Sequence, residues 1–300
     1  MGGGDPHVGP LFAAPTPKST PGLYLVATPI GNAEDISLRA LRVFAHADVV
    51  ACEDTRVTGR LFAMHGISVP LTAYHEHNAE RQRPHLLARL ARGEVVALAS
   101  DAGTPLISDP GYKLVREAIA AGHTVTVLPG ASAPLAALLL SGLPTDRFCF
   151  LGFLPAKSAQ RRKAVAAVAA FPGTILLFES PHRLAASLDD LATILGDRPA
   201  AVARELTKLY EEVRRDRLVE LARHYAQAGA PKGEIVVVIG GPEAKPSEAE
   251  PAALDRRLAA ALETLSIRDA AAQVAGELGL PRREVYARAL TVAKRNEGGR

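Results

Sequence analysis

The sequence Ser100-Asp-Ala-Gly-Thr-Pro-Leu-Ile-Ser-Asp-Pro-Gly111 follows directly on the apolar run Val95–Ala99. An apolar run of this length predicts a buried parallel strand, and Ser108, Asp109 and Pro110 are typical of a capped helix start. The connecting loop is therefore expected at the carboxyl end of a strand, where open α/β sheets bind ligands. From this segment alone, a decorated strand-to-helix connection without a ligand is the alternative.

Outward from this loop, apolar runs alternate with helical patterns, which predicts an α/β protein with a mostly parallel first sheet. A first domain is expected over residues 22–144 and a second over residues 145–241. The first has strands at 23–28, 48–52, 71–74, 95–99 and 124–128 and helices near 37–46, 56–64, 79–91, 111–121 and 132–141. The second has strands at 148–153, 174–178, 200–204, 211–215 and 234–239 and helices near 159–170 and 181–195.

The two ends of the chain differ from this pattern. Residues 1–21 are rich in Gly, Pro and Thr, which predicts a disordered leader, and residues 242–252 have the composition of a linker. Residues 253–300 form a predicted helical tail with helices at 254–265, 268–278 and 283–294. The break Gly279-Leu-Pro281 resembles the turn of a helix-turn-helix that binds RNA, and a small helical cap is the alternative.

Composition limits the setting of the protein. Two cysteines, Cys52 and Cys149, leave no disulfide framework or zinc cluster, which favours the reducing cytoplasm. No apolar run is long enough to cross a bilayer, so no membrane contact is expected. The pair His75 and His77 could share one face of a strand, but no third ligand is suitably spaced, and no metal is expected.

The net charge of +3 is weakly informative, but basic residues are clustered. Lys157, Arg161, Arg162 and Lys163 form one cluster, and Arg282 with Arg283 begins another in the tail. Local basic patches of this kind suit a phosphate backbone, so these six residues are candidate RNA contacts. A solvated helix face is the alternative for each cluster.

Two further loops close strands in the same manner as 100–111. Thr28-Pro-Ile-Gly-Asn32 follows the first strand and Pro129-Gly-Ala-Ser132 follows the fifth. Three such loops at strand ends outline a cleft where backbone amides can hold a cofactor. A dinucleotide site is not expected, because Gly31 is the only glycine of a G-x-G-x-x-G pattern in the first loop.

Six motifs together resemble one known family, ribosomal RNA small subunit methyltransferase I, within the tetrapyrrole methylase superfamily. They are Thr28-Pro-Ile-Gly-Asn32, Glu53-Asp-Thr-Arg56, the stretch 100–111, Gly152-Phe-Leu-Pro-Ala-Lys157, Glu179-Ser-Pro-His-Arg183 and Ala203-Arg-Glu-Leu-Thr-Lys208. The resemblance runs from about residue 22 to the C-terminus. It implies two α/β domains, the second with a mixed sheet, usually in a homodimer. It also implies S-adenosylmethionine-dependent 2′-O-methylation of a cytidine in the decoding centre of 16S rRNA in the 30S subunit.

The resemblance places the cofactor between the two domains. The matching cofactor residues are Pro29, Gly31, Asp101, Ala102, Gly103, Ile107, Ser108, Ser132, Ala133, Phe178, Ala203 and Gly233. Asp54, with Arg56 beside it, is the candidate catalytic pair, because the superfamily's second strand ends in an aspartate proposed as a base. The alternative is that Asp54 caps the next helix or pairs with Arg56. His182 and Arg183 match a family motif without an assigned role.

Two other functions stay open at this point. A tetrapyrrole methyltransferase would act on a small macrocycle, for which the basic clusters have no evident use. A non-catalytic RNA-binding assembly factor could keep the fold, but intact cofactor loops argue against it.

Overall fold

The computed structural model describes residues 19–242, 251–278 and 280–297. These residues fall into two compact units that divide between residues 242 and 243. Most of the predicted leader and linker lies outside the described residues. Among the described helices, none is long and apolar enough to cross a membrane.

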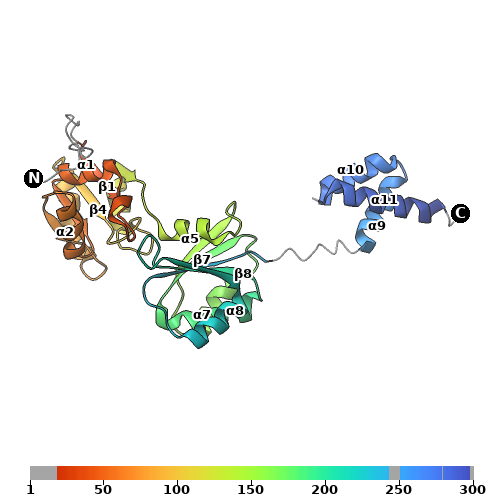
Figure 1. The fold of residues 1–300 in the computed structure, drawn as a ribbon. Helices are drawn as coiled ribbons and strands as arrows, with labels where there is room; N and C mark the ends of the chain where they lie inside the picture. The colour runs from red at the N-terminus through yellow and green to blue at the C-terminus, as the bar shows by residue number, and fades with distance from the viewer. Residues whose placement is uncertain (1–18, 243–250, 279, 298–300) are drawn as a thin grey trace, which may run out of the picture. The chain divides into compact units, whose positions relative to one another are not determined.

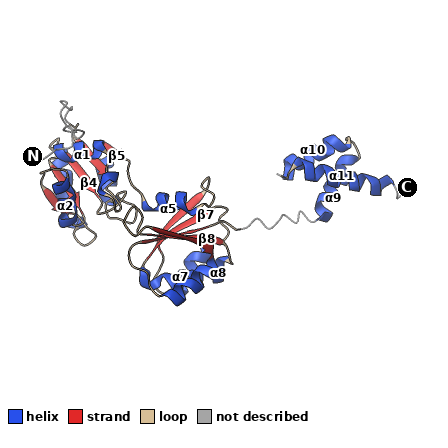
Figure 2. Ribbon diagram, viewed as in Figure 1, coloured by secondary structure: helices blue, strands red, loops and turns tan. Residues whose placement is uncertain are grey.

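The first sheet consists of five parallel strands in the order β3-β2-β4-β1-β5 (Figures 1 and 2). The strands are β1 (Gly22–Val26), β2 (Val49–Cys52), β3 (Leu71–Ala73), β4 (Val95–Ala99) and β5 (Val125–Leu128). Every residue of β1, β2 and β4 is buried, as expected for strands with helices on both faces. The predictions of a mostly parallel first sheet and of a buried parallel strand at 95–99 are confirmed.

Helices cover this sheet on both faces. Phe44 of α1 (Leu38–His46) and Phe62 of α2 (Thr55–Met64) pack into the core on one face. On the other face, Leu86 of α3 (Ala79–Ala91) and Leu114 of α4 (Tyr112–Ala120) are buried. The alternating strand and helix pattern of the sequence produces these layers because each helix buries one apolar stripe.

The second sheet is mixed, in the order β6-β7-β10-β8-β9. Only the pair of β6 (Phe148–Phe153) and β7 (Thr174–Glu179) is parallel; β10 (Ile235–Ile239), β8 (Pro199–Arg204) and β9 (Glu212–Arg217) pair antiparallel with their neighbours. One face carries α6 (Ser158–Ala167), α7 (Leu184–Leu195) and α8 (Leu218–Ala228). The mixed second sheet is therefore confirmed.

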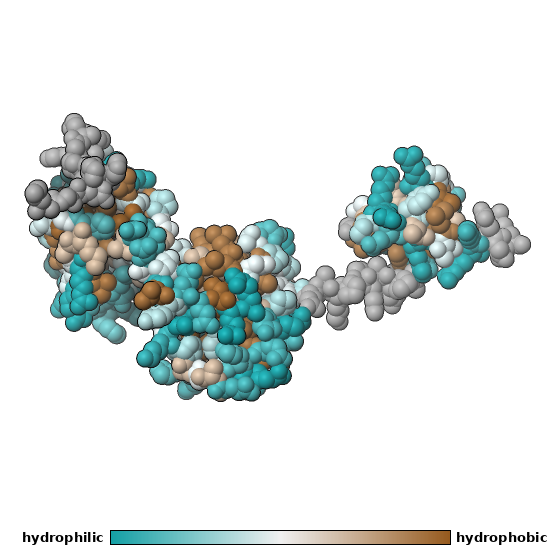
Figure 3. All heavy atoms as spheres, in the orientation of Figure 1, coloured by the Kyte–Doolittle hydropathy of each residue, from teal (hydrophilic) through white to brown (hydrophobic). Residues whose placement is uncertain are grey.

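Two features of this part differ from the sequence predictions. Helix α8 is absent from those predictions, although its Leu218, Leu221 and Tyr225 have the spacing of a buried helical stripe. Helix α5 (Ala133–Ser141) closes the predicted first domain in sequence, yet its Ala137 and Leu138 pack on the second sheet. The opposite side of α5 is exposed, and Figure 3 shows hydrophobic atoms gathered over this helix.

The second unit is helical, with α9 (Pro251–Leu262), α10 (Ile267–Leu278) and α11 (Arg282–Glu297). Leu258, Val274 and Val285, one from each helix, form its core. Arg288 of α11 donates two hydrogen bonds, of 2.6 and 2.8 Å, to Asp255 of α9. This bidentate pair joins the first and last helices of the unit.

Candidate functional site

The three loops singled out in the sequence meet at one edge of the first sheet. They follow β4, β1 and β5, which are neighbours in the strand order, and parallel neighbours end at the same edge. Thr28 and Gly103 exchange backbone hydrogen bonds of 2.9 and 3.0 Å, and Thr104 donates from its hydroxyl to the carbonyl of Ala131 at 3.1 Å. The loops therefore form one hydrogen-bonded layer.

This layer faces the second sheet across a cavity of about 410 Å³. The far wall comes from β7, β8 and β10, where Phe178 and Ala203 both lie opposite Val236 in the strand pairing. The lining residues are Ile30, Asp101, Ala102, Gly103, Thr104, Ile107, Ser108, Asp109, Ser132, Ala133, Pro134, Phe153, Phe178, Glu179, Ser180, Pro181, Ala203, Leu206, Gly233, Glu234, Ile235 and Val236. This volume lies in the range of small-molecule sites.

The structure brings together the predicted cofactor residues, and all except Pro29 and Gly31 line the cavity. Those two flank Ile30, which does line it. A Cβ on Gly31 would lie 2.7 Å from the Thr207 hydroxyl and would also clash with the side chain of Lys208. Gly31 therefore permits close contact between the first loop and the connection from β8 to β9, where Asn32 also donates from its backbone to Thr207 at 3.1 Å.

Strained backbone gathers in the loops on both sides of the cavity. Leu106 and Ser108 have φ of 73° and 68° in one loop, and Glu205 and Thr207 have φ of 50° and 63° in the other. Positive φ is energetically unfavourable for residues other than glycine, and residues with such backbone angles cluster at functional sites. The strain indicates that the surrounding contacts fix the shape of these loops.

Two of the carboxylates that line the cavity, Asp101 and Asp109, are affected by burial. Burial raises the pKa of the Asp101 carboxyl and of the Asp109 carboxyl above their ordinary values. Asp109 accepts a short hydrogen bond from Ser100, and Asp101 accepts one of 2.9 Å from the backbone N–H of Asp54. A positively charged ligand would offset the cost of ionising both groups.

Asp54 itself is not among the residues that line the cavity. Its carboxylate caps α2 by accepting from the Arg56 backbone at 2.8 Å, and the Arg56 guanidinium lies 2.6 Å from it. These hydrogen bonds lower the pKa of Asp54 to about 2. The geometry is that of a helix cap and ion pair, the alternative that the sequence left open.

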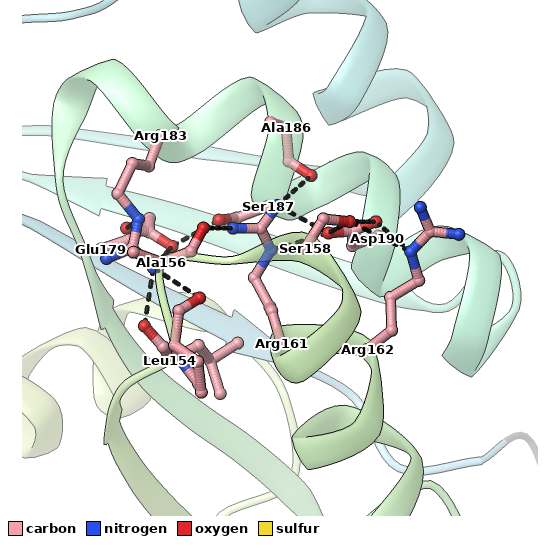
Figure 4. Close-up of polar contacts among 11 residues, drawn as sticks. Leu154, Ala156, Ser158, Arg161, Arg162, Glu179, Arg183, Ala186, Ser187 and Asp190 are labelled. Carbon is pink, nitrogen blue, oxygen red and sulfur yellow. Dashed lines mark hydrogen bonds and ion pairs between the residues drawn. The ribbon is translucent and has the colours of Figure 1, made fainter.

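The basic cluster at the start of α6 divides into two kinds of residue. Lys157 and Lys163 are exposed. Arg161 is 4% exposed, and its guanidinium binds Asp190 at 2.6 Å and the carbonyl of Ala156 at 3.2 Å (Figure 4). The expectation that Arg161 contacts RNA is corrected, because its donors are engaged inside the protein.

Arg162 occupies an intermediate position in the same cluster. Its side chain is 52% exposed, yet it binds Asp190 at 2.8 Å and the hydroxyl of Ser158 at 3.1 Å. The buried Asp190 thus receives two arginines and a serine. Arg162 retains a solvent-facing surface that Arg161 lacks.

A second ion pair, between the half-buried Arg183 and the buried Glu179, explains part of a motif that had no assigned role. The Glu179 side chain is fully buried, lies 3.2 Å from Arg183 and accepts a short hydrogen bond from Ser187. Arg183 also donates to the carbonyl of Leu154 at 2.7 Å (Figure 4). The pair ties the end of β7 to the loop after β6, whereas His182 is exposed.

The histidines of the 75–77 segment lie side by side, with ring centroids 6.1 Å apart. The backbone N–H of His75 donates a hydrogen bond of 2.9 Å to the side chain of Asn78, the residue just before α3. Across the described ranges, no group of three or more His, Cys, Asp or Glu residues is arranged to hold a metal ion.

Comparison with protein families gives two matches. Residues 22–222 match the Tetrapyrrole (Corrin/Porphyrin) Methylases, and residues 248–293 match the RsmI C-terminal HTH domain. Among curated relatives, the ribosomal RNA small subunit methyltransferase I of Mesorhizobium japonicum is 54% identical over 90% of this chain and 92% of its own. The protein of that name in Escherichia coli O157:H7 is 46% identical over 89% of this chain and 94% of its own.

Solved structures show the same fold at lower identity. Diphthine synthase superposes with a TM-score of 0.58 at 21% identity, covering 73% of this chain and 89% of its own. The uroporphyrin-III C-methyltransferase of Thermus thermophilus, solved as a complex with S-adenosylhomocysteine, gives 0.51 at 24% identity, covering 73% and 97%. At these identities the likeness concerns the fold.

The burial of Arg161 generates a stability prediction. Arg161→Met leaves Asp190 in the interior without its main partner, so the free energy of unfolding should fall by about 3 kcal/mol. Urea denaturation measures this change. Lys163→Met, on the exposed side of the same helix, should change the unfolding free energy by less than about 0.5 kcal/mol. Equal stability of Arg161→Met and wild type would show that the ion pair is not structural.

Proposed function

Because the chain belongs to the ribosomal RNA small subunit methyltransferase I family of the tetrapyrrole methylases, we propose that it methylates the 2′-hydroxyl of a cytidine in the decoding centre of 16S rRNA. The methyl donor in this proposal is S-adenosylmethionine, and the substrate is the 30S subunit. The cavity carries the proposal, because its lining contains nearly every residue that matches the family's cofactor motifs.

The chemistry of the cavity suits this cofactor. Ile30, Phe178 and Val236 offer apolar surface for a flat base and an aliphatic chain, and Asp101 and Asp109 offer carboxylates. When bound, S-adenosylmethionine supplies a methyl group on a positively charged sulfur. That charge would favour the ionised forms of the two carboxyl groups, whose pKa values burial raises.

Methyl transfer to a hydroxyl needs alignment and removal of one proton. We assign alignment to the layer of loops that the Thr28–Gly103 hydrogen bonds hold together. Asp54, with a pKa of about 2, is a poor acceptor for the hydroxyl proton. Its proposed task is to cap α2 and to direct its backbone N–H at Asp101.

The RNA contacts in this proposal are the exposed cations of both units. One group lies at the start of α6 and consists of Lys157, Arg162 and Lys163. The other lies at the start of α11 in the helical unit and consists of Arg282 and Arg283. Cations on a helix suit phosphate oxygens, whose neutralisation releases counterions. A homodimer in the cytoplasm, where 30S subunits are, completes the proposal.

The direct test uses purified protein and 30S subunits that lack the modification. With S-adenosylmethionine, we expect one methyl group on the 2′-oxygen of a single cytidine, mapped on the 16S rRNA. Asp101→Ala should weaken cofactor binding by about 10- to 100-fold, since hydrogen bonds to charged groups contribute about 1.5–3 kcal/mol. Calorimetry measures this, with Asp146→Ala as an exposed control outside the cavity.

Three results would contradict the proposal in different ways. If the wild type did not bind S-adenosylmethionine, the proposal that this protein is a methyltransferase would be wrong. Cofactor binding without methylation of 30S subunits would favour a non-catalytic assembly factor. Methylation of a tetrapyrrole macrocycle instead of RNA would identify the other kind of methyltransferase.

The role of Asp54 generates a second prediction. Asp54→Asn keeps a residue that caps helices as well as aspartate does, so kcat should stay within about threefold of wild type. Asp54→Ala removes the cap and should lower kcat further by disturbing Asp101. Single-turnover methylation of 30S subunits measures both. If Asp54→Asn lowered kcat tenfold or more without changing cofactor affinity, Asp54 would instead be the group that accepts the hydroxyl proton.

The helical unit generates a third prediction. Removal of residues 243–300 should weaken binding to 30S subunits and flatten its dependence on salt. The log–log slope should change by about 0.7–0.9 for each phosphate that the shortened protein no longer neutralises. Arg282→Ala/Arg283→Ala should reproduce part of this change. Cofactor affinity should persist, because every lining residue precedes residue 243.

Two controls accompany this experiment. The shortened protein must keep the oligomeric mass and melting temperature expected for its length. Arg92→Ala, an exposed arginine at the opposite edge of the first sheet from the cavity loops, should leave the salt slope unchanged. An unchanged slope after removal of 243–300 would mean that the unit does not contact RNA.

A further inference from the structure

Phe153 is an aromatic residue of the cavity wall that is also exposed to solvent. It lines the cavity, and it is 59% exposed. Its ring packs on Phe178 at a centroid distance of 5.3 Å, and Phe178 in turn packs on Phe150 at 4.9 Å. The outermost ring of this aromatic row thus keeps much of its apolar surface in water, which is costly without a partner.

The backbone around Phe153 is fixed by two arginines, the buried Arg161 and the half-buried Arg183. Arg183 donates to the carbonyl of Leu154, and Arg161 donates to the carbonyl of Ala156. Each arginine is anchored on a buried carboxylate, as Figure 4 shows for the residues under this loop. Gly152, with φ of 64°, supplies the bend at the end of β6. The exposed ring is therefore presented by a rigid loop.

Two exposed lysines follow Phe153 in the sequence. Lys157 precedes α6 and is exposed, and Lys163 is exposed further along the same helix. An aromatic side chain beside cations is the combination that binds unpaired nucleotides, since the ring stacks on a base and the cations meet phosphates. A substrate without phosphates would leave the lysines without a counterpart.

Resting on the proposed RNA methylation, we propose that Phe153 is the stacking platform for the base of the target nucleotide, with Lys157 meeting an adjacent phosphate. A ribose inside a stacked helix cannot reach a cavity, so the nucleotide must turn out of its stack and lose stacking energy. The exposed face of Phe153 restores this energy at the cavity. Phe178, on the inner side, remains for the cofactor.

The sequence offers a matched control for this proposal. Phe148 begins the same strand that Phe153 ends, and it is 42% exposed but does not line the cavity. Phe153→Leu removes the aromatic face and keeps an apolar side chain, and Phe153→Tyr keeps the ring. Phe148→Leu makes the same chemical change away from the cavity.

The experiment measures methylation of 30S subunits, KM for 30S subunits and cofactor affinity by calorimetry for the full-length variants. Phe153→Leu should raise KM or lower kcat/KM about 5- to 100-fold, the range expected for loss of one stacked base. Its cofactor affinity should stay within twofold of wild type, Phe153→Tyr should restore most of the activity, and Phe148→Leu should match wild type. Gel filtration confirms that each variant keeps its mass.

Different failures lead to different conclusions. Equal kinetics of Phe153→Leu and wild type would overturn the platform and leave the proposed function intact. Loss of cofactor affinity in Phe153→Leu would overturn it by assigning the ring to the cofactor. A wild type that does not methylate 30S subunits would overturn the proposed function, and the platform with it.

Discussion

The paired backbone hydrogen bonds between Thr28 and Gly103 are the interaction on which the cavity depends. They join the loops after β1 and β4 into one layer, and the third loop joins this layer through Thr104. The bonds use both backbone polar groups of Gly103, so this glycine shapes the wall of the cavity. A positive φ of 79° with Ile30 only 3.2 Å from a would-be Cβ explains why glycine stands there.

Buried charge organises the opposite wall. The buried carboxylates of Asp190 and Glu179 each bind an arginine, and each arginine donates to a carbonyl of the loop after β6. Burying ions costs energy that such pairs repay only with well-placed hydrogen bonds. Here the bonds fix one loop conformation, which carries Phe153 at the cavity and leads to the exposed Lys157 before α6. If Phe153 binds the substrate as we propose, fold and substrate contact depend on the same ion pairs.

Local patterns were sufficient for most of the fold and for part of the site. The alternation of apolar runs and amphipathic helices predicted the parallel sheet, because periodicity depends on which face each residue buries. Helix α8 escaped prediction although its buried apolar residues have helical spacing. The cofactor residues came from motif resemblance, and the cavity gathers them, but the order of the strands that makes their loops neighbours is not visible in any single segment.

The sequence by itself determined most of the elements, the class of fold, the family and the residues that match its cofactor motifs. Only the tertiary structure decided what individual charges do. Arg161 and Lys163 are neighbours in one basic run, yet one faces Asp190 in the interior and the other faces water, because a helix turns them to different sides. Likewise, Asp54 and Asp101 are both acids at strand ends, and only the packing of loops makes one a helix cap and the other a wall of the cavity.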